Sequence, residues 1–320
     1  MSLTNEQISF FKDQGYLRIR GVMDTQLCAE ALFCMWNALP PNSRLKRDQP
    51  STHIGPFTDD ERSTDSLHIR NGYLWQWRAA GTSDLLINLI YSRTITTMAQ
   101  TLLGEGLRVP VVGGTPMGSR GSAWPGGPTD PAQGNEGARG IYFTLPYGNK
   151  AREPDRAHTD GHPFQLGIVG LLSDVPVDGG AFKVWPGSHK RLYPTFQMQY
   201  DQPRIPYYSH LPSHKGIVHS EAYLDELARL HEDTQAVECS GRTGDVVFWH
   251  HRTAHMAGHN YTSVIRQAVL ADFWKTELDQ YRCDPPQANM WRDWSQAINT
   301  ADPTAYSDDF AASQGLKLNR

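Results

Sequence analysis

Residues 243–260 read Thr243-Gly-Asp-Val-Val-Phe-Trp-His-His-Arg-Thr-Ala-His255-Met-Ala-Gly-His-Asn260. The β-branched and aromatic run at 245–250 predicts a strand, and the Gly-His-Asn triplet predicts a turn beyond His255. Further short runs of this kind lie between glycines, prolines and asparagines, at residues 108–112, 140–145, 166–172, 181–185 and 265–274. This pattern is typical of an all-β sandwich or barrel rather than of alternating βα units.

The first third of the chain carries the signals of helices instead. Thr4 and Gln7 form a capping-box pattern for a helix that ends at Gly15, and a short strand is expected at 16–19. Further helices are predicted after Asp24, within residues 83–103 and at residues 220–231. The sequence therefore predicts a mainly β protein with supporting helices.

We expect one domain with three parts. These are a mostly helical N-terminal buttress at residues 1–106, a β core with lid-like loops at 107–275, and a C-terminal extension at 276–320. The expected loops are the Gly- and Pro-rich stretch 117–140 and the Tyr- and Pro-rich stretch 193–208. Long segments without periodicity inside a compact domain usually bind ligands or close over them.

The composition argues against a nucleic-acid partner, a membrane span and a disulfide scaffold. The 320 residues include 30 Lys and Arg against 34 Asp and Glu, a formal charge of −4, so little is available to neutralise a phosphate backbone and no nucleic-acid partner is expected. The longest apolar run, 166–172, is far shorter than the roughly 20 residues that span a bilayer. Four cysteines without CxxC spacing do not suggest a disulfide scaffold, and no signal-peptide pattern opens the chain. We therefore expect a soluble, cytoplasmic protein.

Two histidines and one carboxylate stand out as possible metal ligands. His158 and Asp160 lie two residues apart in the β-rich half, where alternate side chains share one face of a strand. The other such pair, His231 and Asp233, ends a helical pattern, so those side chains should diverge. With His255, the first pair supplies the 2-His-1-carboxylate set that holds non-haem Fe(II) and leaves other positions open. Neighbouring histidines remain alternative ligands: His162, His250, His251 and His259.

An arginine stands near the start of the apolar run 265–274. Burying its guanidinium is costly unless an anion meets it. Beside such a triad, Arg266 would have a partner if it held the far carboxylate of 2-oxoglutarate bidentately. Thr144, expected to point inward from the run at 140–145, is a further candidate contact in that pocket.

Several of these stretches together resemble the phytanoyl-CoA dioxygenase family of Fe(II)/2-oxoglutarate oxygenases. They are His158-Thr-Asp160, Gly179-Gly-Ala-Phe-Lys-Val-Trp-Pro-Gly-Ser-His189, Gly244-Asp-Val-Val-Phe-Trp, and His255 with Asn260 and Arg266. The stretch 6–22 is similar to the opening of that family, so the resemblance touches both ends of residues 5–275. It implies a double-stranded β-helix, a jelly-roll core of the cupin kind. It also implies that His158, Asp160 and His255 bind iron and that Arg266 binds 2-oxoglutarate.

The resemblance further implies the reaction. With Fe(II), 2-oxoglutarate and O2, such a dioxygenase (EC 1.14.11) hydroxylates a C–H bond of a small-molecule substrate and releases succinate and CO2. Because related halogenases replace the carboxylate by a small residue, Asp160 favours hydroxylation over halogenation. Candidate substrate contacts are Arg156, Thr159 and Trp185, although the tryptophan also fits barrel-wall packing. Lys150, Arg152 and Arg156 form either a solvated loop or a cationic rim for an acidic or CoA-linked substrate.

Two other functions remain open from the sequence. A cupin-like, metal-dependent oxygenase or isomerase would keep the barrel and the metal but would not use 2-oxoglutarate, and Arg266 argues against it. A non-catalytic small-molecule-binding barrel would usually lack a member of the triad, whereas all three residues are present.

Overall fold

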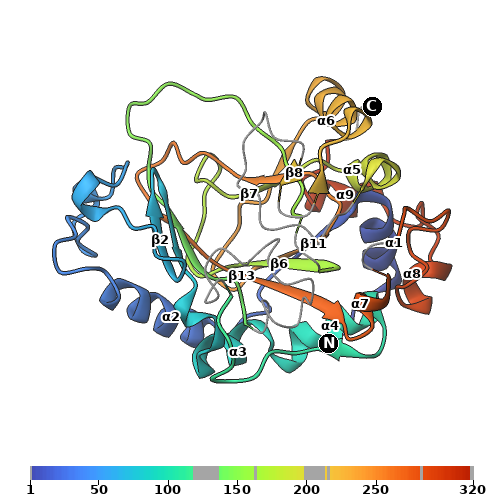
Figure 1. Ribbon diagram of the computed structural model, residues 1–320, viewed down its shortest axis with the longest axis horizontal. Coiled ribbons are helices and arrows are strands. Elements are labelled where there is room, and N and C mark those ends of the chain that lie inside the picture. The colour runs from blue at the N-terminus through green and yellow to red at the C-terminus, as the bar shows by residue number, and fades with distance from the viewer. Residues whose placement is uncertain are drawn as a thin grey trace.

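Two β-sheets and the helices around them make up the fold (Figure 1). The computed structural model describes residues 2–117, 137–161, 164–197, 213–214, 217–281 and 284–317, and the statements below concern these residues. The strands of the main sheet, in order of pairing, are β1 (Tyr16–Ile19), β11 (Val246–His250), β6 (Leu166–Leu171), β13 (Arg266–Lys275), β5 (Gly140–Thr144), β3 (Leu74–Trp77) and β2 (His68–Asn71), with β4 (Leu107–Arg108) beside β13.

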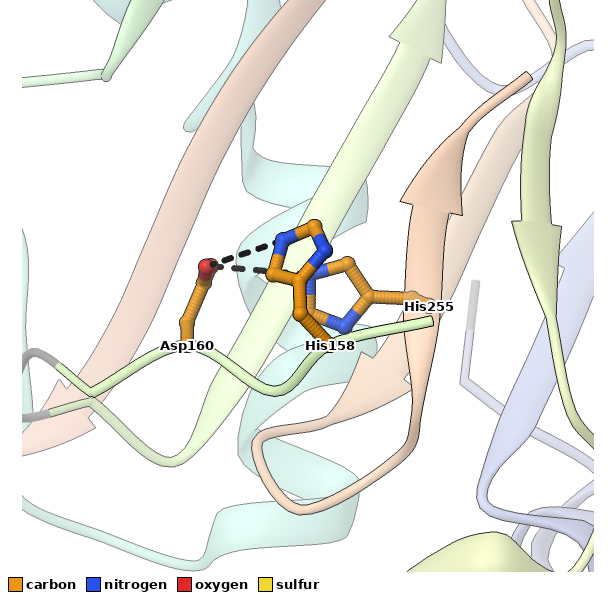
Figure 2. Close-up of side chains that lie close together, drawn as sticks. All are labelled: His158, Asp160 and His255. Carbon is orange, nitrogen blue, oxygen red and sulfur yellow. Dashed lines mark ion pairs between the residues drawn. The ribbon is translucent and has the colours of Figure 1, made fainter. Parts of the chain in front are cut away.

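The smaller sheet contains β10 (Val237–Glu238), β7 (Phe182–Val184) and β12 (His255–Ala257), and β8 (Ser213–His214) pairs separately with β9 (Ile217–Val218). Every pair of neighbouring strands in the main and smaller sheets is antiparallel. An isolated β-bridge joins His158 to His255 and so brings the two predicted ligands side by side (Figure 2). The core is therefore the predicted double-stranded β-helix.

The helices are α1 (Asn5–Gln14), α2 (Thr25–Asn37), α3 (Asp84–Ile90), α4 (Arg93–Leu103), α5 (Ser188–Leu192), α6 (Glu221–Asp233), α7 (Leu278–Tyr281), α8 (Gln296–Thr300) and α9 (Asp308–Ser313). In Figure 1, α2, α3 and α4 lie on one side of the main sheet, and the small sheet lies on the other side with α5 and α6. The apolar side chains of α4 are buried toward the sheet, as an amphipathic helix requires. Within the described residues, we find no helix long and apolar enough to cross a bilayer.

Most of the elements predicted from sequence are confirmed. Thr4 accepts a hydrogen bond from the Gln7 amide and the Gln7 side chain returns one, and α1 ends at Gly15 in the left-handed conformation. β1 has the predicted bounds. Residues 83–103 form two helices, and the later helix begins after its cap Ser220.

One predicted strand is wrong in part, one hairpin was not predicted, and the predicted loops stay untested. The strand predicted at 108–112 is wrong beyond residue 108, because Pro110 has no N–H to donate and Val111 is exposed. The hairpin of β2 and β3 was not predicted; its strands pair as far as Asn71 and Leu74, so the two-residue loop is Gly72-Tyr73, with Gly72 at a φ of +55°. β1, β2 and β3 all join the main sheet, so the predicted N-terminal buttress contributes strands as well as helices. The predicted loops fall largely outside the described residues, at 118–136 and 198–208.

The C-terminal extension packs against α1. Phe10 contacts Tyr306 and Phe310 edge to face, and Phe11 packs on Trp291 and Trp294. The Lys12 ammonium donates hydrogen bonds to the carbonyls of residues 299 and 301, which lie in and beside α8. α1 and the C-terminal extension therefore pack together as one layer beside the barrel.

Two buried histidines lie under this layer. His189 donates from Nε2 to the Lys12 carbonyl, its ring lies 5.3 Å from the ring of His250, and His250 stacks on Trp294 at 4.9 Å. Burial lowers the pKa of His189 to about 3 and lowers the pKa of His250 well below its usual range. Both imidazoles are therefore neutral in the folded protein at any ordinary pH.

Acid is expected to destabilise the protein through this pair. The unfolded chain takes up these protons near pH 6.5, whereas folded His189 does so only near pH 3. The stability that depends on the neutral rings is therefore complete above about pH 6.5 and falls as the pH decreases toward 3. In urea titrations across this range, His189→Gln should reduce the pH slope of the unfolding free energy by up to about 1.4 kcal/mol per pH unit. An unchanged slope would contradict the burial argument.

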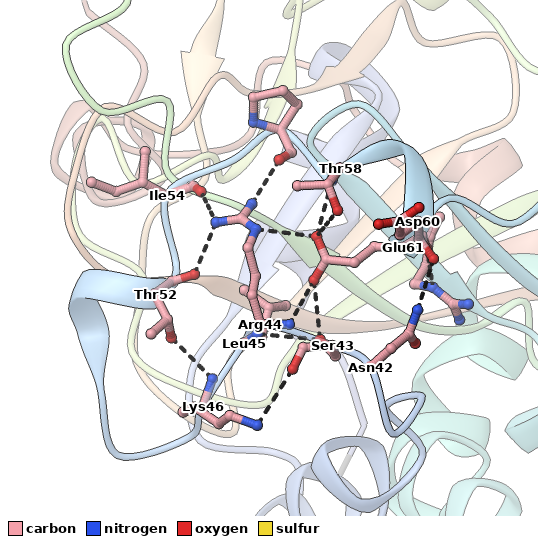
Figure 3. A network of polar contacts seen from close by, with 12 residues as sticks. Asn42, Ser43, Arg44, Leu45, Lys46, Thr52, Ile54, Thr58, Asp60 and Glu61 are labelled. Carbon is pink, nitrogen blue, oxygen red and sulfur yellow. Dashed lines mark hydrogen bonds and ion pairs between the residues drawn. The ribbon is translucent and has the colours of Figure 1, made fainter.

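A polar network fixes the long connection between α2 and β2 (Figure 3). The buried Glu61 carboxylate accepts hydrogen bonds from the side chains of Ser43, Arg44 and Thr58 and from the backbone N–H groups of Arg44 and Thr58. The same guanidinium donates to the carbonyls of Thr52, Ile54 and Pro56. Burial alone would raise the pKa of Glu61, but these hydrogen bonds lower it.

Glu61→Ala is expected to lower the free energy of unfolding by about 3–5 kcal/mol, because it leaves a partly buried guanidinium and several buried donors without their acceptor. Asp59→Ala is the matched control in the same turn. Asp59 is 89% exposed and, among the described residues, pairs only with the exposed Arg62, so its loss should cost less than about 0.5 kcal/mol. Urea denaturation of both variants measures the difference, and similar losses would show that the network is not a stabilising element.

Candidate metal centre

The three predicted ligands lie together. Figure 2 shows Asp160 facing both histidines, and the carboxylate oxygens lie 3.7 Å from Nε2 of His158 and 3.7 Å from Nε2 of His255. One ligand atom from each residue lies within 4.8 Å of the others. The Asp160 and His255 side chains are 3% and 5% exposed, whereas His158 is 38% exposed. The set is therefore buried on the Asp160 side and opens to solvent beside His158.

Backbone pairing sets the positions of the two histidines. His158 and His255 exchange both N–H···O bonds, at 3.0 and 2.9 Å, and their ring centroids are 4.6 Å apart. His255 Nδ1 lies 2.9 Å from the Thr253 carbonyl, which can only accept, so Nδ1 carries the proton. The lone pair of His255 is therefore on Nε2, which faces Asp160, as metal coordination requires.

The alternative histidines are elsewhere. His250 is buried against Trp294, His251 bonds the Phe164 carbonyl through Nδ1, and His259 lies 3.8 and 3.9 Å from the acids of residues 153 and 155. His162 is outside the described residues. His231, on α6, accepts a hydrogen bond from the Ala157 amide and does not pair with Asp233, which bonds Arg191 instead. In the described part of the chain, one such cluster of ligands is present.

An arginine that the sequence argument did not single out holds Asp160. Arg139 Nη1 lies 2.6 Å from Asp160 Oδ2, while Nε and Nη2 bind the two oxygens of Asp272 at 2.8 and 2.6 Å. All three side chains are buried. A signal was available, because Asp272 is a carboxylate within the apolar strand β13 and needs a buried cation as much as Arg266 needs an anion.

Arg266 is buried at the start of β13 and faces Thr144 across the sheet. The two residues are directly paired on β13 and β5, so their side chains lie on the same face. Arg266 Nε and Thr144 Oγ1 are both buried without a hydrogen-bond partner among the described residues. Burial lowers the pKa of Arg266 to about 10, and nearby Tyr142 offsets this only in part. These two groups form a buried, cationic site with donors for a carboxylate.

The turn before Arg266 is tightly fixed. The buried Asn260 donates from Nδ2 to the carbonyls of Thr144 and Val264, at 3.0 and 2.7 Å. A Cβ on Gly180 would approach Asn260 Cβ and Thr144 Cγ2 to 3.0 and 3.3 Å, and Gly180 has a φ of +78°. The Gly179-Gly180 pair therefore lets the small sheet approach the strand that carries Thr144.

Two of the candidate substrate residues face away from the triad. The Thr159 hydroxyl bonds the Tyr223 hydroxyl of α6 at 2.7 Å, and Trp185 lies in the same apolar cluster, with the ring of His231 5.2 Å away. Alternation along the chain explains this, because His158 and Asp160 point inward and residue 159 points outward. Both side chains therefore pack against α6, and their role as substrate contacts stays a prediction.

The predicted cationic rim is largely neutralised. Lys150 pairs with Glu153 and Arg152 pairs with Asp178, whereas Arg156 is exposed. Neutral pairs give an anionic substrate little attraction, so the geometry favours the solvated-loop interpretation for the first two.

A cavity open to solvent lies between the barrel and the C-terminal extension. Its inner wall includes Phe164, whose ring is 5.0 Å from the Arg139 guanidinium that binds Asp160. Phe164 and then Arg139 therefore lie between this cavity and Asp160, and no triad residue lines the cavity. Aromatic and polar groups line most of it, among them Tyr193, Phe196, His251, Arg252, Tyr281 and Trp294.

Comparison with models of protein families found one match. Residues 148–268 match the family model described as phytanoyl-CoA dioxygenase (PhyH). This region contains all three triad residues and Arg266. No curated protein gave a significant match.

Solved structures of similar fold were also found. EctD from S. alaskensis, crystallised with 2-oxoglutarate and 5-hydroxyectoine, is 17% identical, with a TM-score of 0.50 over 86% of this chain and 77% of that one. The carbocyclase SnoK from nogalamycin biosynthesis is 19% identical, with a TM-score of 0.49 over 91% of this chain and 95% of that one. The epimerase SnoN is 18% identical, with a TM-score of 0.48 over 84% of this chain and 82% of that one. At this level of identity, the likeness to EctD supports the fold.

Proposed function

We propose that the protein is a non-haem Fe(II)/2-oxoglutarate-dependent dioxygenase that hydroxylates a C–H bond of a small molecule, because residues 148–268 match the phytanoyl-CoA dioxygenase family model. The observation that carries this proposal is the pairing of a 2-His-1-carboxylate set with a buried arginine that faces no carboxylate in the described part of the chain. A metal site alone would fit many cupin-like proteins. The buried arginine favours a protein that also binds an anionic co-substrate.

The residues present fit both groups. Two imidazoles and one carboxylate are the donor set of non-haem Fe(II) oxygenases, and three protein ligands leave positions for co-substrate and O2. The bound iron and 2-oxoglutarate would supply the oxidising chemistry, with succinate and CO2 as co-products. His158, Asp160 and His255 would hold the metal, while Arg266 and the Thr144 hydroxyl would hold the far carboxylate of 2-oxoglutarate.

Burying Arg266 has a specific consequence for binding. A guanidinium without an anion is costly in a buried site, and a carboxylate that enters removes this cost while forming charge-assisted hydrogen bonds. Relief of this cost therefore contributes to the free energy of 2-oxoglutarate binding.

Hydroxylation is the outcome we propose among several known for similar folds. The comparison structures include a carbocyclase and an epimerase as well as EctD with 5-hydroxyectoine. The triad carboxylate is present as Asp160, so no ligand position is vacated for halide. We place the substrate on the open side of the triad, beside the partly exposed His158.

Two measurements test this function. Anaerobic calorimetry with Mn(II)-loaded protein should show 2-oxoglutarate binding at one site per chain, and no binding would contradict the proposal. A screen of small molecules for succinate release should then be followed by mass spectrometry under 18O2. One 18O atom in the product identifies hydroxylation, and product without label would move the outcome to another oxidation.

A further inference from the structure

We propose that Arg139 is a positioning residue that fixes the Asp160 carboxylate for metal binding, and that Asp272 holds Arg139 in place and balances its charge. This inference rests on the proposed metal centre, although it concerns residues outside the ligand set. The juxtaposition that carries it is the buried row Asp272–Arg139–Asp160.

Arg139 supplies Asp160 with a side-chain contact at a point where strand pairing does not hold the backbone. His158 is held by a β-bridge to His255, but Asp160 lies in no strand and follows that bridge by two residues. Without a hydrogen-bonded partner, rotation about χ2 would swing the carboxylate oxygens away from the two imidazoles. The hydrogen bond of 2.6 Å from Arg139 Nη1 to Asp160 Oδ2 fixes this χ2 angle. In that orientation one carboxylate oxygen lies 3.7 Å from Nε2 of His158 and the other lies 3.7 Å from Nε2 of His255.

Arg139 can do this because it is itself rigid. Its guanidinium forms a two-pronged pair with Asp272, which gives the fork a single orientation. The Phe164 and Trp249 rings lie over it, with Cζ 5.0 and 5.5 Å from the two centroids. The remaining nitrogen, Nη1, then points at the Asp160 carboxylate.

Charge explains why a second carboxylate is present. An arginine 2.6 Å from a ligand oxygen would repel a divalent metal. Asp272 neutralises the guanidinium, so Asp160 receives a strong hydrogen bond while the pair adds no net charge to the site. Partners of this kind, one step out from a metal ligand, typically change metal affinity by about 10- to 100-fold.

The test uses Co(II) alone as the probe, because its visible absorption reports ligand geometry without turnover. A double variant, Arg139→Met with Asp272→Leu, removes both charges and keeps an apolar filling of similar size. We expect it to bind Co(II) about 10- to 100-fold more weakly than the wild-type protein and with an altered spectrum. Arg139→Lys, which keeps one charge without the fork, should restore part of the affinity.

The control is Arg44→Met, which breaks the arginine–carboxylate network of Figure 3 away from the triad. It should lower stability to urea without changing Co(II) affinity or spectrum. If the double variant does not fold, Asp272→Asn takes its place and should weaken Co(II) binding several-fold, because the Arg139 charge is then unbalanced.

The outcomes separate this inference from the proposed function. Wild-type affinity and spectrum in the double variant, or in Asp272→Asn, would overturn the role of Arg139 while leaving the metal centre intact. Absence of Co(II) binding by the wild-type protein would overturn both.

Discussion

A His255→Ala variant is expected to bind Fe(II) at least about 100-fold more weakly than the wild-type protein, since loss of a ligand should exceed the effect of losing an outer partner. His255 Nδ1 is tied to the Thr253 carbonyl, which leaves Nε2 to face Asp160. Alanine removes a donor that no other described side chain is placed to replace. Anaerobic titration with Fe(II), followed by tryptophan fluorescence or calorimetry, measures the loss.

His259→Ala is the matched control for that measurement. It removes a histidine four residues further on, whose ring faces Glu153 and Asp155 instead of the triad. Its Fe(II) affinity should equal that of the wild-type protein. If His259→Ala lost the metal and His255→Ala kept it, the ligand assignment would be wrong.

An Arg266→Met variant is expected to bind 2-oxoglutarate at least about 30-fold more weakly, because truncating one partner of a buried, charged pair costs roughly 2–5 kcal/mol. Fe(II) binding should be unchanged. The free protein should also become as stable as the wild-type protein or more so, because the variant removes a buried guanidinium that has no carboxylate partner among the described residues. Loss of binding together with a gain in stability is the signature of a residue kept for a ligand.

Calorimetry of the Mn(II)-loaded variant with 2-oxoglutarate, and urea unfolding of the free protein, provide the two readouts. Thr144→Val serves as the graded comparison. Losing one neutral hydrogen bond should cost only about 0.5–1.5 kcal/mol, or roughly 2- to 12-fold in affinity. Wild-type 2-oxoglutarate affinity in Arg266→Met would remove the co-substrate assignment while leaving the metal centre in place.

The triad could be predicted because local sequence patterns indicate how its side chains are placed. Two ligands two residues apart share a face of extended backbone, and the third follows a strand whose turn residues are evident. The same alternation already implied that Thr159 faces away from the metal, as its bond to Tyr223 shows. Arg266 was predictable for another local reason, namely a single cation in an apolar strand.

The residues that were missed depend on tertiary contacts. Arg139 and Asp272 are 133 residues apart, and nothing near Arg139 indicates that it meets a ligand. Trp185, a candidate substrate contact that also fits barrel-wall packing, lies in the apolar cluster beside α6, and sequence does not show on which side of the small sheet that helix lies. The β2–β3 hairpin, by contrast, has a local signal, because Gly72 supplies the positive φ that its two-residue turn requires.

The most direct test of the central claim is anaerobic addition of Fe(II) and 2-oxoglutarate to the metal-free protein, followed by visible absorption. The account predicts a metal-to-ligand charge-transfer band that requires both components, saturates at one equivalent of each, is lost in His158→Ala and weakens in Arg266→Met. Fe(II) binding without any band at saturating 2-oxoglutarate would contradict the account and favour a cupin-like enzyme that does not use this co-substrate. Failure to bind Fe(II) at all would leave a barrel that only binds small molecules.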